Sequence, residues 1–512
     1  MKSIIQLRKP GRQWASLLFA MVTAAAVLMV CTKSSFLYPM NDWVDVQCFL
    51  TMGRELMRGQ IPYVDLYEQK GPVLYFVYAL ASVFSQKSFF GVFLLEIITV
   101  GLFLHYSGRI AELYLGKSRI IYLLQIILAV ITCTSYTFRH GGGVEEMSLF
   151  FFSYGLYAVL RAVHEKRELS FREALLNGVF VGCAFWAKYT MVGFYLGLAL
   201  FVLIWYLGWV QDGKKLLRTI GQFLLGFAVV SAVVVIFFWA VGGLEDLYTA
   251  YFYNNLFLYP DESELSKWAQ IIDNYQTMVQ WVPELTFLLC AGIVFFLLRL
   301  HKNYLDLLGT ILCFAGLAVG TCWGKSMSYY ALVFYAFSVF GLIGIAWLLQ
   351  SPHVKELYHI LAEKIQRLPQ CLVAFALVCA VIYSYAASSN TYLMEYDREE
   401  MPQYQFAETI NQVEDATVLN FGFLDGGFYY AADVQPTCKF FCTFNVSAPG
   451  MWQTQYEVIN EKQVDFVITR KYELSHYNVK AANYTLVDTA QLYFEGVDFV
   501  YYLYQVAENG MP

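Results

Sequence analysis

Long apolar segments recur along this chain of 512 residues, from its amino terminus to about residue 387. A helix needs about 20 apolar residues to cross the hydrocarbon core of a bilayer, and many of these segments approach that length. Such helices can bury their side chains only against one another or against lipid. The sequence therefore predicts a polytopic α-helical membrane protein.

The charge and the cysteines limit the partners. The formal net charge is -6, and no basic patch is interleaved with aromatic residues in the way that a nucleic-acid groove requires. We expect contact with membrane lipid and none with nucleic acid. Of the eleven cysteines, only Cys438 and Cys442 share a soluble segment. The sequence leaves open whether these two thiols pair.

The basic residues predict the orientation in the membrane. Lys2, Arg8, Lys9 and Arg12 precede the first apolar span, so we expect the amino terminus in the cytoplasm and the following loop outside. A cleaved signal peptide is the alternative for this segment, and it leaves the same loop outside.

The apolar run from Val73 to Phe84 is too short to cross a membrane. Its dozen residues cover about 18 Å of a core about 30 Å thick, so we interpret it as an interfacial or re-entrant helix. With this run left out, the basic loops, Lys355 to Arg367 included, all lie inside, and about eleven spans place the carboxyl terminus outside. The predicted spans are Ala15 to Thr32, Ser88 to Ser107, Ile120 to Phe138, Met147 to Leu160, Ala174 to Thr190, Val192 to Val210, Phe223 to Val241, Leu285 to Leu298, Leu305 to Trp323, Tyr329 to Leu349 and Cys371 to Ala387.

The composition changes to that of a soluble domain near Ser388. Helical and strand patterns alternate there, which predicts a small α/β domain outside the membrane. We therefore divide the chain into a membrane domain, 1–387, with an outer loop at 33–87 that contains interfacial helices, and a tail domain, 388–512. The predicted helices of the tail are Gln403 to Val413 and Trp452 to Lys462, and the strands are Thr417 to Phe421, Cys438 to Phe444, Asp465 to Thr469, Tyr484 to Val487 and Phe499 to Val506. Asp425-Gly426-Gly427 is a turn signal with no assigned chemistry.

The outer loop collects charges in a chain that is 58% hydrophobic and 14% charged. Desolvating a charge at a membrane surface is costly, so charges kept there are functional candidates. The candidates in this loop are Asp42, Asp45, Asp65, Glu68 and Lys70.

A family resemblance is carried by the order of residues in this loop. The order is Asp45, Gly53, Gly59, Pro62-Tyr63, Asp65, Glu68, Lys70 and Gly71-Pro72. It resembles the first external loop of the bacterial GT-C glycosyltransferases related to protein O-mannosyltransferases and to lipid A aminoarabinose transferases. Weaker likenesses lie at Gly141 to Glu146, where glycine replaces the usual asparagine, and at Lys325 to Tyr330, where Ser328 replaces the usual histidine.

The resemblance implies a GT-C membrane fold and a hexosyl or pentosyl transferase of the bacterial plasma membrane. The donor would be a polyprenyl-phosphate-linked sugar, the acceptor would lie in the cell envelope, and the anomeric carbon would be inverted. Asp45 occupies the family's position for the general base, which takes the proton of the acceptor hydroxyl. The alternative role for Asp45 is the N-cap of a helix from Val46 to Met57. Asp42 is the neighbour best able to replace it.

Lysines are the candidates for binding the donor phosphate, because the negative charge on this leaving group grows in the transition state and a cation stabilises it. Lys70 is the first of them, and its alternative role is to extend toward lipid head groups. Lys188 lies 16 residues beyond Arg172, about 24 Å along a helix, so we expect it at the outer surface near Lys70. Lys325, followed by Tyr329 and Tyr330, is the third candidate.

The remaining acids have weaker assignments. Glu145 and Glu146 begin an inward span, where carboxylates favour the helix dipole with or without a substrate. Asp65 and Glu68 are expected to orient Lys70 or to touch the acceptor. No histidine or cysteine cluster has metal-ligand spacing, and carboxylates alone permit a divalent ion without predicting one. We therefore predict no cofactor.

Other function classes stay open. A flippase or transporter of lipid-linked sugars would carry its charges at the bilayer midplane on broken helices, whereas these charges gather at outer ends. A polysaccharide polymerase and a binding scaffold are two more classes that the sequence allows. The sequence names neither the sugar nor the acceptor, which leaves protein, lipid, teichoic acid and wall polysaccharide.

Overall fold

The computed structural model describes residues 10–258, 265–349, 368–446, 448–494 and 496–507. The predicted basic segment Lys355 to Arg367 and the residues Lys2, Arg8 and Lys9 lie outside these ranges. Contacts between residues divide the chain into two compact units. The first comprises residues 1–32, 93–230 and 263–391, and the second comprises residues 33–92, 231–262 and 392–512. The second unit thus joins the first outer loop to the carboxyl-terminal tail.

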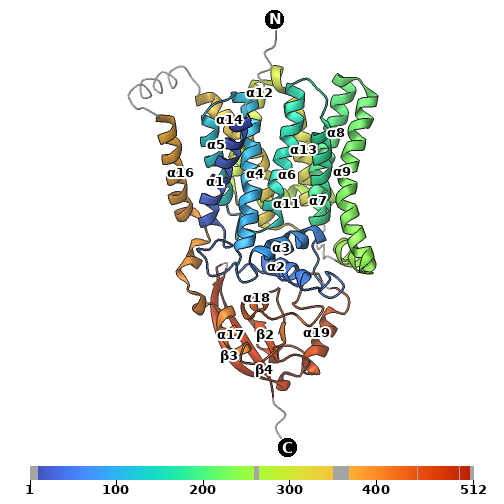
Figure 1. The fold of residues 1–512 in the computed structure, drawn as a ribbon, viewed down its shortest axis with the longest axis vertical. Helices are drawn as coiled ribbons and strands as arrows, with labels where there is room; N and C mark the ends of the chain where they lie inside the picture. The colour runs from blue at the N-terminus through green and yellow to red at the C-terminus, as the bar shows by residue number, and fades with distance from the viewer. Residues whose placement is uncertain (1–9, 259–264, 350–367, 447, 495, 508–512) are drawn as a thin grey trace, which may run out of the picture. The chain divides into compact units, whose positions relative to one another are not determined.

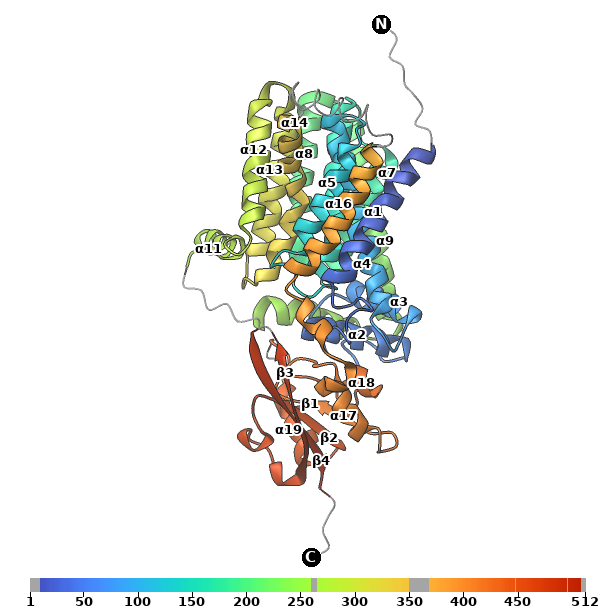
Figure 2. The same cartoon turned by 90° about the vertical axis from the view of Figure 1, so that its left-hand side faces the viewer.

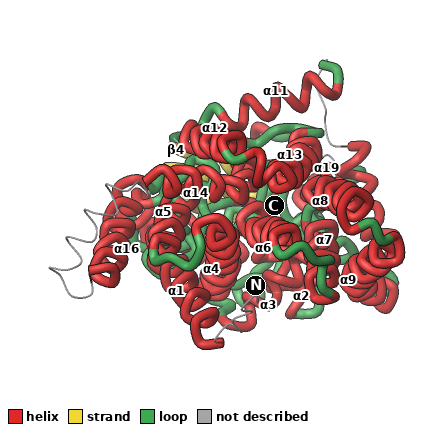
Figure 3. The backbone as a smooth tube through the Cα atoms, turned by 90° about the horizontal axis from the view of Figure 1, so that it is seen from above, coloured by secondary structure: helices red, strands yellow, loops and turns green. Residues whose placement is uncertain are grey.

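The first unit is a bundle of helices whose axes are roughly aligned (Figure 1). In the view along the bundle, α16 lies at its edge beside α1 and α5, and α9 lies beside α7 and α8 (Figure 3). The helices are α1 (Pro10–Cys31), α4 (Phe90–Leu115), α5 (Ile120–Cys133), α6 (Val144–His164), α7 (Phe171–Ala187), α8 (Val192–Trp205), α9 (Gly213–Ala240), α11 (Lys267–Val279), α12 (Pro283–Leu298), α13 (Leu300–Cys322), α14 (Ser338–Leu349) and α16 (Leu368–Ala387), of which α4 and α9 continue into the second unit.

Glycines allow helices of this bundle to approach closely. A Cβ atom on Gly193 of α8 would lie 2.1 Å from the carbonyl oxygen of Gly316 in α13, and one on Gly316 would lie 2.2 Å from that of Gly193. In lipid, helices associate through close packing of small residues rather than through the hydrophobic effect. The α8 and α13 backbones therefore pack in direct contact.

The number of spans differs from the prediction. Seven helices within the described ranges are long and apolar enough to cross a membrane, or eight if α11 and α12 form one bent span. The predicted spans at α5 and α7 have 14 and 17 residues, which is short for a full crossing. The membrane-protein prediction is confirmed, and the count of eleven stays a prediction.

Helix α11 was missed because its apolar residues recur at helical spacing along one face and form no continuous apolar run. The predicted spans leave the segment between Val241 and Leu285 without a helix, but α11 forms there and meets α12 at a bend of 112°. Figure 2 shows α11 at the margin of the bundle, across the direction of α12. The Asn274 side chain donates to the carbonyls of Cys322, 3.0 Å, and Gly324, 2.7 Å, so it satisfies orphaned carbonyls at the end of α13.

The second unit contains a four-stranded sheet in the order β1-β2-β4-β3. Strands β1 and β2 are parallel, with Leu419 opposite Val467, and β4 runs antiparallel to both β2 and β3. The elements are α2 (Val44–Met57), α3 (Pro72–Phe84), α10 (Leu244–Leu247), α17 (Pro402–Ile410), β1 (Val418–Asn420), α18 (Phe428–Ala432), α19 (Met451–Asn460), β2 (Phe466–Arg470), β3 (Tyr484–Phe494) and β4 (Val497–Val506). The predicted α/β tail is confirmed.

One predicted strand of the tail is wrong. Cys438 to Phe444 is loop, because its backbone groups bond to partners outside the sheet. The Phe441 carbonyl accepts from the Tyr429 hydroxyl, and the Phe440 carbonyl accepts from the Gln455 side chain. With these groups occupied, the segment cannot join a ladder.

Candidate functional site

Asp45 lies in the first turn of α2, where it is half-buried. The N-cap of this helix is Trp43, with no side-chain cap, so the alternative role of Asp45 as N-cap is wrong. A carboxylate in the first turn of a helix interacts favourably with the helix dipole.

Asp42 forms an ion pair with a residue that the sequence did not identify as its partner. The Nζ atom of Lys33 lies 2.7 Å from Asp42 Oδ1, and both side chains are buried. Lys33 also donates to the hydroxyl of Tyr392 at 3.1 Å. A buried pair of this kind holds its carboxylate in place, and removing either partner is costly. The available signal was a lysine at the end of the first span, nine residues before an acid.

Asp65 and Glu68 shape the loop that carries Lys70. Asp65 is exposed and accepts from the backbone N–H of Ile61 at 2.6 Å. Glu68 is buried and accepts from the backbone N–H of Lys70 at 2.8 Å and from the hydroxyl of Tyr75. Burial, and then the charge of Glu68, raises the pKa of Tyr75 well above its usual value, so this hydroxyl stays a donor. Both acids act on the backbone of the loop.

The loop that carries Lys70 has a strained backbone at Tyr63. Tyr63 has a φ of 70°, a left-handed conformation that costs a non-glycine residue on the order of 1 kcal/mol or more. Its hydroxyl donates to the carbonyl of Lys70, and its backbone N–H donates to the carbonyl of Leu66. The Asn255 side chain donates to the carbonyl of Gln69 at 2.7 Å. The loop is therefore fixed from several sides.

Lys70 lies over the face of α2 that carries Asp45. Its Nζ is 5.8 Å from the ring centroid of Phe49, and Phe49 follows Asp45 by four residues, so the two share one face of the helix. Helices α2 and α3 pack closely here, since a Cβ on Gly53 would lie 2.6 Å from the backbone of Tyr78. Lys70 is half-buried and lies two residues before the start of α3, and its Nζ faces the α2 residue one helical turn after the predicted acid.

In the first unit, Lys188 joins three other candidates. It forms an ion pair with Glu145, and its Nζ lies 3.4 Å from the ring centroid of Tyr330 and 5.9 Å from that of Tyr329. Lys325 is exposed and forms no hydrogen bond or ion pair with another residue of the described ranges. The predicted nearness of Lys188 to Lys70 stays a prediction.

Glu146 has a different environment from its neighbour Glu145. It is buried, and its Oε2 accepts from the backbone N–H of Gly142 at 2.9 Å. Gly141 and Gly142 have φ of 82° and 81°, and a Cβ on Gly141 would lie 2.0 Å from Thr32 Oγ1. This geometry requires a glycine at 141.

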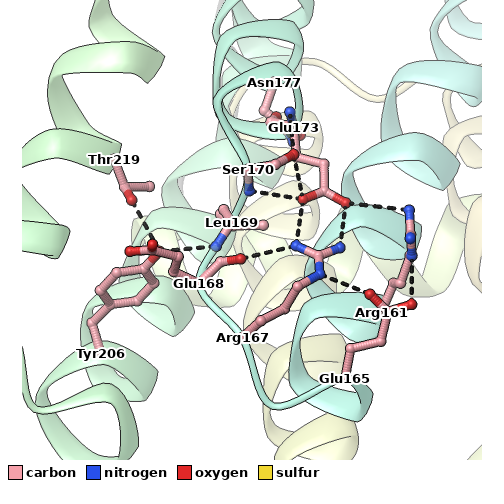
Figure 4. Close-up of polar contacts among 10 residues, drawn as sticks. All are labelled: Arg161, Glu165, Arg167, Glu168, Leu169, Ser170, Glu173, Asn177, Tyr206 and Thr219. Atoms are coloured by element: carbon pink, nitrogen blue, oxygen red, sulfur yellow. Dashed lines mark hydrogen bonds and ion pairs between the residues drawn. The ribbon is translucent and has the colours of Figure 1, made fainter. Parts of the chain in front are cut away.

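A further polar network, at the turn between α6 and α7, contains none of the predicted site residues (Figure 4). The guanidinium of Arg167 donates two hydrogen bonds of 2.7 Å to Glu173, one of 2.7 Å to Glu165 and one of 2.9 Å to the carbonyl of Glu168. Ser170 and Glu173 form a capping box for α7. The cation and the acids satisfy one another, so this network stabilises the turn.

Potential metal ligands do not gather in the part of the chain that the structure describes. No three histidine, cysteine, aspartate or glutamate side chains of these ranges are grouped so that they could hold a metal ion. None of the eleven cysteines, all of which lie in described ranges, is in a disulfide. The sulfur of Cys442 lies 3.9 Å from that of Cys48 in α2.

One protein family and several solved structures are similar to this chain. The sequence model of the dolichyl-phosphate-mannose-protein mannosyltransferase family matches residues 69–239, which include Lys70, Glu145, Glu146 and Lys188. The chain is similar to ArnT from Cupriavidus metallidurans in the apo state, with a TM-score of 0.59 and 13% identity over 97% of this chain and 98% of that chain. It is also similar to ArnT bound to undecaprenyl phosphate, with a TM-score of 0.56 and 14% identity over 96% and 98% of the two chains.

The chain has the GT-C fold. The resemblance to GT-C glycosyltransferases that the first outer loop carries is thereby confirmed. A search of curated proteins finds no match. At such low identity, the likeness to solved GT-C structures establishes the fold alone, and the chemistry is argued from the site.

Proposed function

We propose that this chain is a membrane glycosyltransferase that moves a sugar from a polyprenyl-phosphate-linked donor to an acceptor in the cell envelope. One observation supports the proposal: the Nζ atom of the half-buried Lys70 lies 5.8 Å from the ring centroid of Phe49, one helical turn after the half-buried acid Asp45 in α2. One of the similar structures, ArnT from Cupriavidus metallidurans, is bound to undecaprenyl phosphate, which supports a polyprenyl donor. The enzyme would work in the bacterial plasma membrane, with its amino terminus in the cytoplasm and its tail outside.

The reaction is a single displacement. Asp45 accepts the proton of the acceptor hydroxyl while the hydroxyl oxygen attacks the anomeric carbon. The bond from that carbon to the phosphate oxygen breaks, and the electron pair leaves with the polyprenyl phosphate. Attack opposite the leaving group inverts the anomeric carbon.

Lys70 stabilises the phosphate as its charge grows. A cation in a site from which water is partly excluded acts more strongly than one in water, and the fixed backbone of its loop lowers the cost of reorganisation. Lys188 and Lys325 are further candidates for phosphate contacts. Lys325 is the better of the two, because the charge of Lys188 is already compensated by Glu145.

Asp45→Asn tests the role of the base. Proteoliposomes with the full chain would receive polyprenyl phosphates that carry labelled hexoses or aminopentoses, together with an envelope extract as acceptor, and released polyprenyl phosphate would be measured. We expect Asp45→Asn to lower transfer roughly 10²- to 10⁴-fold, the usual contribution of a general base. Asp488→Asn, at a half-buried aspartate of β3, is the matched control and should retain activity.

Two outcomes would contradict the proposal. Full transfer by Asp45→Asn would exclude Asp45 as the base. Movement of labelled lipid across the bilayer by the wild type, without release of polyprenyl phosphate, would favour the flippase.

A further inference from the structure

A cavity of about 430 Å³ opens in the tail, outside the segment that the family model covers. Its walls come from the ends of the parallel strands β1 and β2 and from the start of β4. In open α/β sheets, ligands bind in the crevice outside the carboxyl ends of parallel strands. The lining residues are Gly422, Phe423, Arg470, Lys471, Tyr472, His476, Tyr477 and Phe499.

The backbone after both strands is bent into unusual conformations at this cavity. Gly422 has a φ of 84°, and a Cβ there would lie 2.4 Å from the hydroxyl of Tyr477. Lys471, directly after β2, has a φ of 72°. Glycine adopts this conformation without strain, whereas Lys471 is a strained non-glycine residue, and residues of this kind cluster at functional sites.

Arg470 presents an uncompensated charge in this cavity. Its guanidinium carbon lies 4.8 Å from the ring centroid of Phe423 and 4.5 Å from that of Phe499, and the group has a side-chain hydrogen bond with Tyr501. It forms no ion pair with any residue that the structure describes. The rings hold the planar group, whose donors lie in its plane and match a carboxylate or phosphate.

Aromatic rings complete the cavity. The rings of Tyr472 and His476 are stacked, with centroids 4.4 Å apart and planes 11° apart, and both side chains are exposed. The face of a sugar ring carries C–H groups, which pack well against the electron-rich face of an aromatic ring. The cavity thus combines an anion-binding group with surfaces for sugar rings.

We propose that this cavity binds an acidic glycan. Arg470 and Lys471 hold its carboxylate or phosphate, and Tyr472 and His476 pack against an adjacent sugar ring. The glycan is the acceptor of the transfer, and this part of the inference rests on the proposed function. The loop between β1 and α18 supports this assignment. Phe423 of this loop lines the cavity, and Asp425 of the same loop forms a hydrogen bond with α2.

That second contact connects the cavity to the helix that carries Asp45. The Thr51 hydroxyl of α2 donates to Asp425 Oδ2 at 2.6 Å, and the backbone N–H of Gly427 donates to Asp425 Oδ1 at 2.8 Å. A glycan held at the cavity would therefore be anchored on the same loop that supports α2. This arrangement fits an acceptor site better than a site for the lipid donor.

The test measures binding to the detergent-solubilised full chain without any donor. The probes are oligogalacturonate, which carries carboxylates, oligo(glycerol phosphate), which carries phosphates, and neutral oligogalactose. We expect at least one acidic probe to bind at least 10-fold more tightly than the neutral one, and the tighter of the two identifies the anion. Equal affinity for all three probes would overturn the proposal.

Variants identify the residues. Arg470→Gln is expected to weaken binding of the preferred acidic probe at least 10-fold, and Arg470→Lys less, because lysine keeps the charge but not the planar donors. Tyr472→Ala, at an exposed position, should also weaken binding. Lys480→Gln, at an exposed lysine outside the cavity, is the matched control. Unchanged affinity in both Arg470→Gln and Tyr472→Ala would contradict the assignment.

Transfer is measured separately with the preferred probe as acceptor. Binding with no transfer to any acceptor would contradict the proposed function and leave the binding site in place. Transfer to neutral acceptors with no acidic binding would contradict only the glycan site.

Discussion

Two arginines in this protein have opposite surroundings. Arg167, at the turn between α6 and α7, donates to two carboxylates and a carbonyl of its own chain (Figure 4). Arg470, at the end of β2, is held between two phenylalanine rings and forms no ion pair with a described residue. A charge whose partners are built into the chain stabilises a turn. A charge that is held in position without an anionic partner is suited to a ligand.

The largest expected effect on the free energy of unfolding comes from disrupting the hydrogen-bonded network around Arg167. Glu173→Gln removes the carboxylate that receives two hydrogen bonds from Arg167, and it leaves a partly buried guanidinium short of an anion. We expect the free energy of unfolding to fall by about 3 kcal/mol, measured by chemical denaturation of the solubilised protein. Glu168→Gln is the matched control, because the Glu168 carboxylate lies 3.9 Å from Lys215 at the surface and should contribute less than about 1 kcal/mol. Equal effects of the two variants would remove the basis for calling the Arg167 network structural.

The intermediate effect on stability concerns Asp425, a buried carboxylate on the loop that lines the Arg470 cavity. Asp425 is fully buried and has hydrogen bonds but no ion pair with a described residue, and burial raises its pKa from 3.8 to about 6. A raised pKa favours the protonated folded state, so this contribution is full below pH 3.8 and is lost as the pH rises through about 6. Lowering the pH from 7.5 to 4.5 should therefore stabilise the fold by about 2 kcal/mol through this group.

Asp425→Asn isolates that contribution. The difference between the denaturation free energies of wild type and variant should change by about 2 kcal/mol across this pH range. A constant difference from pH 7.5 to 4.5 would show that Asp425 titrates normally in the folded protein.

The smallest expected effect on the free energy of unfolding is that of replacing Arg470. Arg470→Gln loses two cation–π contacts at a partly exposed site, so the free energy of unfolding should fall by about 1 kcal/mol or less. Lys480→Gln should leave it unchanged. A loss near that of Glu173→Gln would make Arg470 a structural residue like Arg167, and the contrast between the two arginines would fail.

The first outer loop was the region best predicted from the sequence. A helix from Val46 to Met57 is predicted and α2 spans Val44–Met57, and the short helix from Val73 to Phe84 corresponds to α3. These predictions rest on local properties, namely the length and spacing of apolar residues. Their success does not extend to α11, whose apolar residues lie at helical spacing among polar ones rather than in a continuous run.

Partners of the charged side chains were not predictable in the same way. Asp42 is paired with Lys33, Lys188 with Glu145, and Arg54 with Asp433, 379 residues away. A local pattern shows that a charge is present, but the chain must fold before its partner is known.

The sequence by itself determined a helical membrane protein, an α/β tail and a loop of candidate residues, because apolar length and residue order are properties of short segments. Only the tertiary structure decided which charges are satisfied. It shows Asp42 buried in an ion pair, Lys70 over the face of α2 that carries Asp45, and Arg470 without an anionic partner among the described residues. The physical reason is that an ion pair depends on proximity in space, which folding creates between residues far apart in the chain.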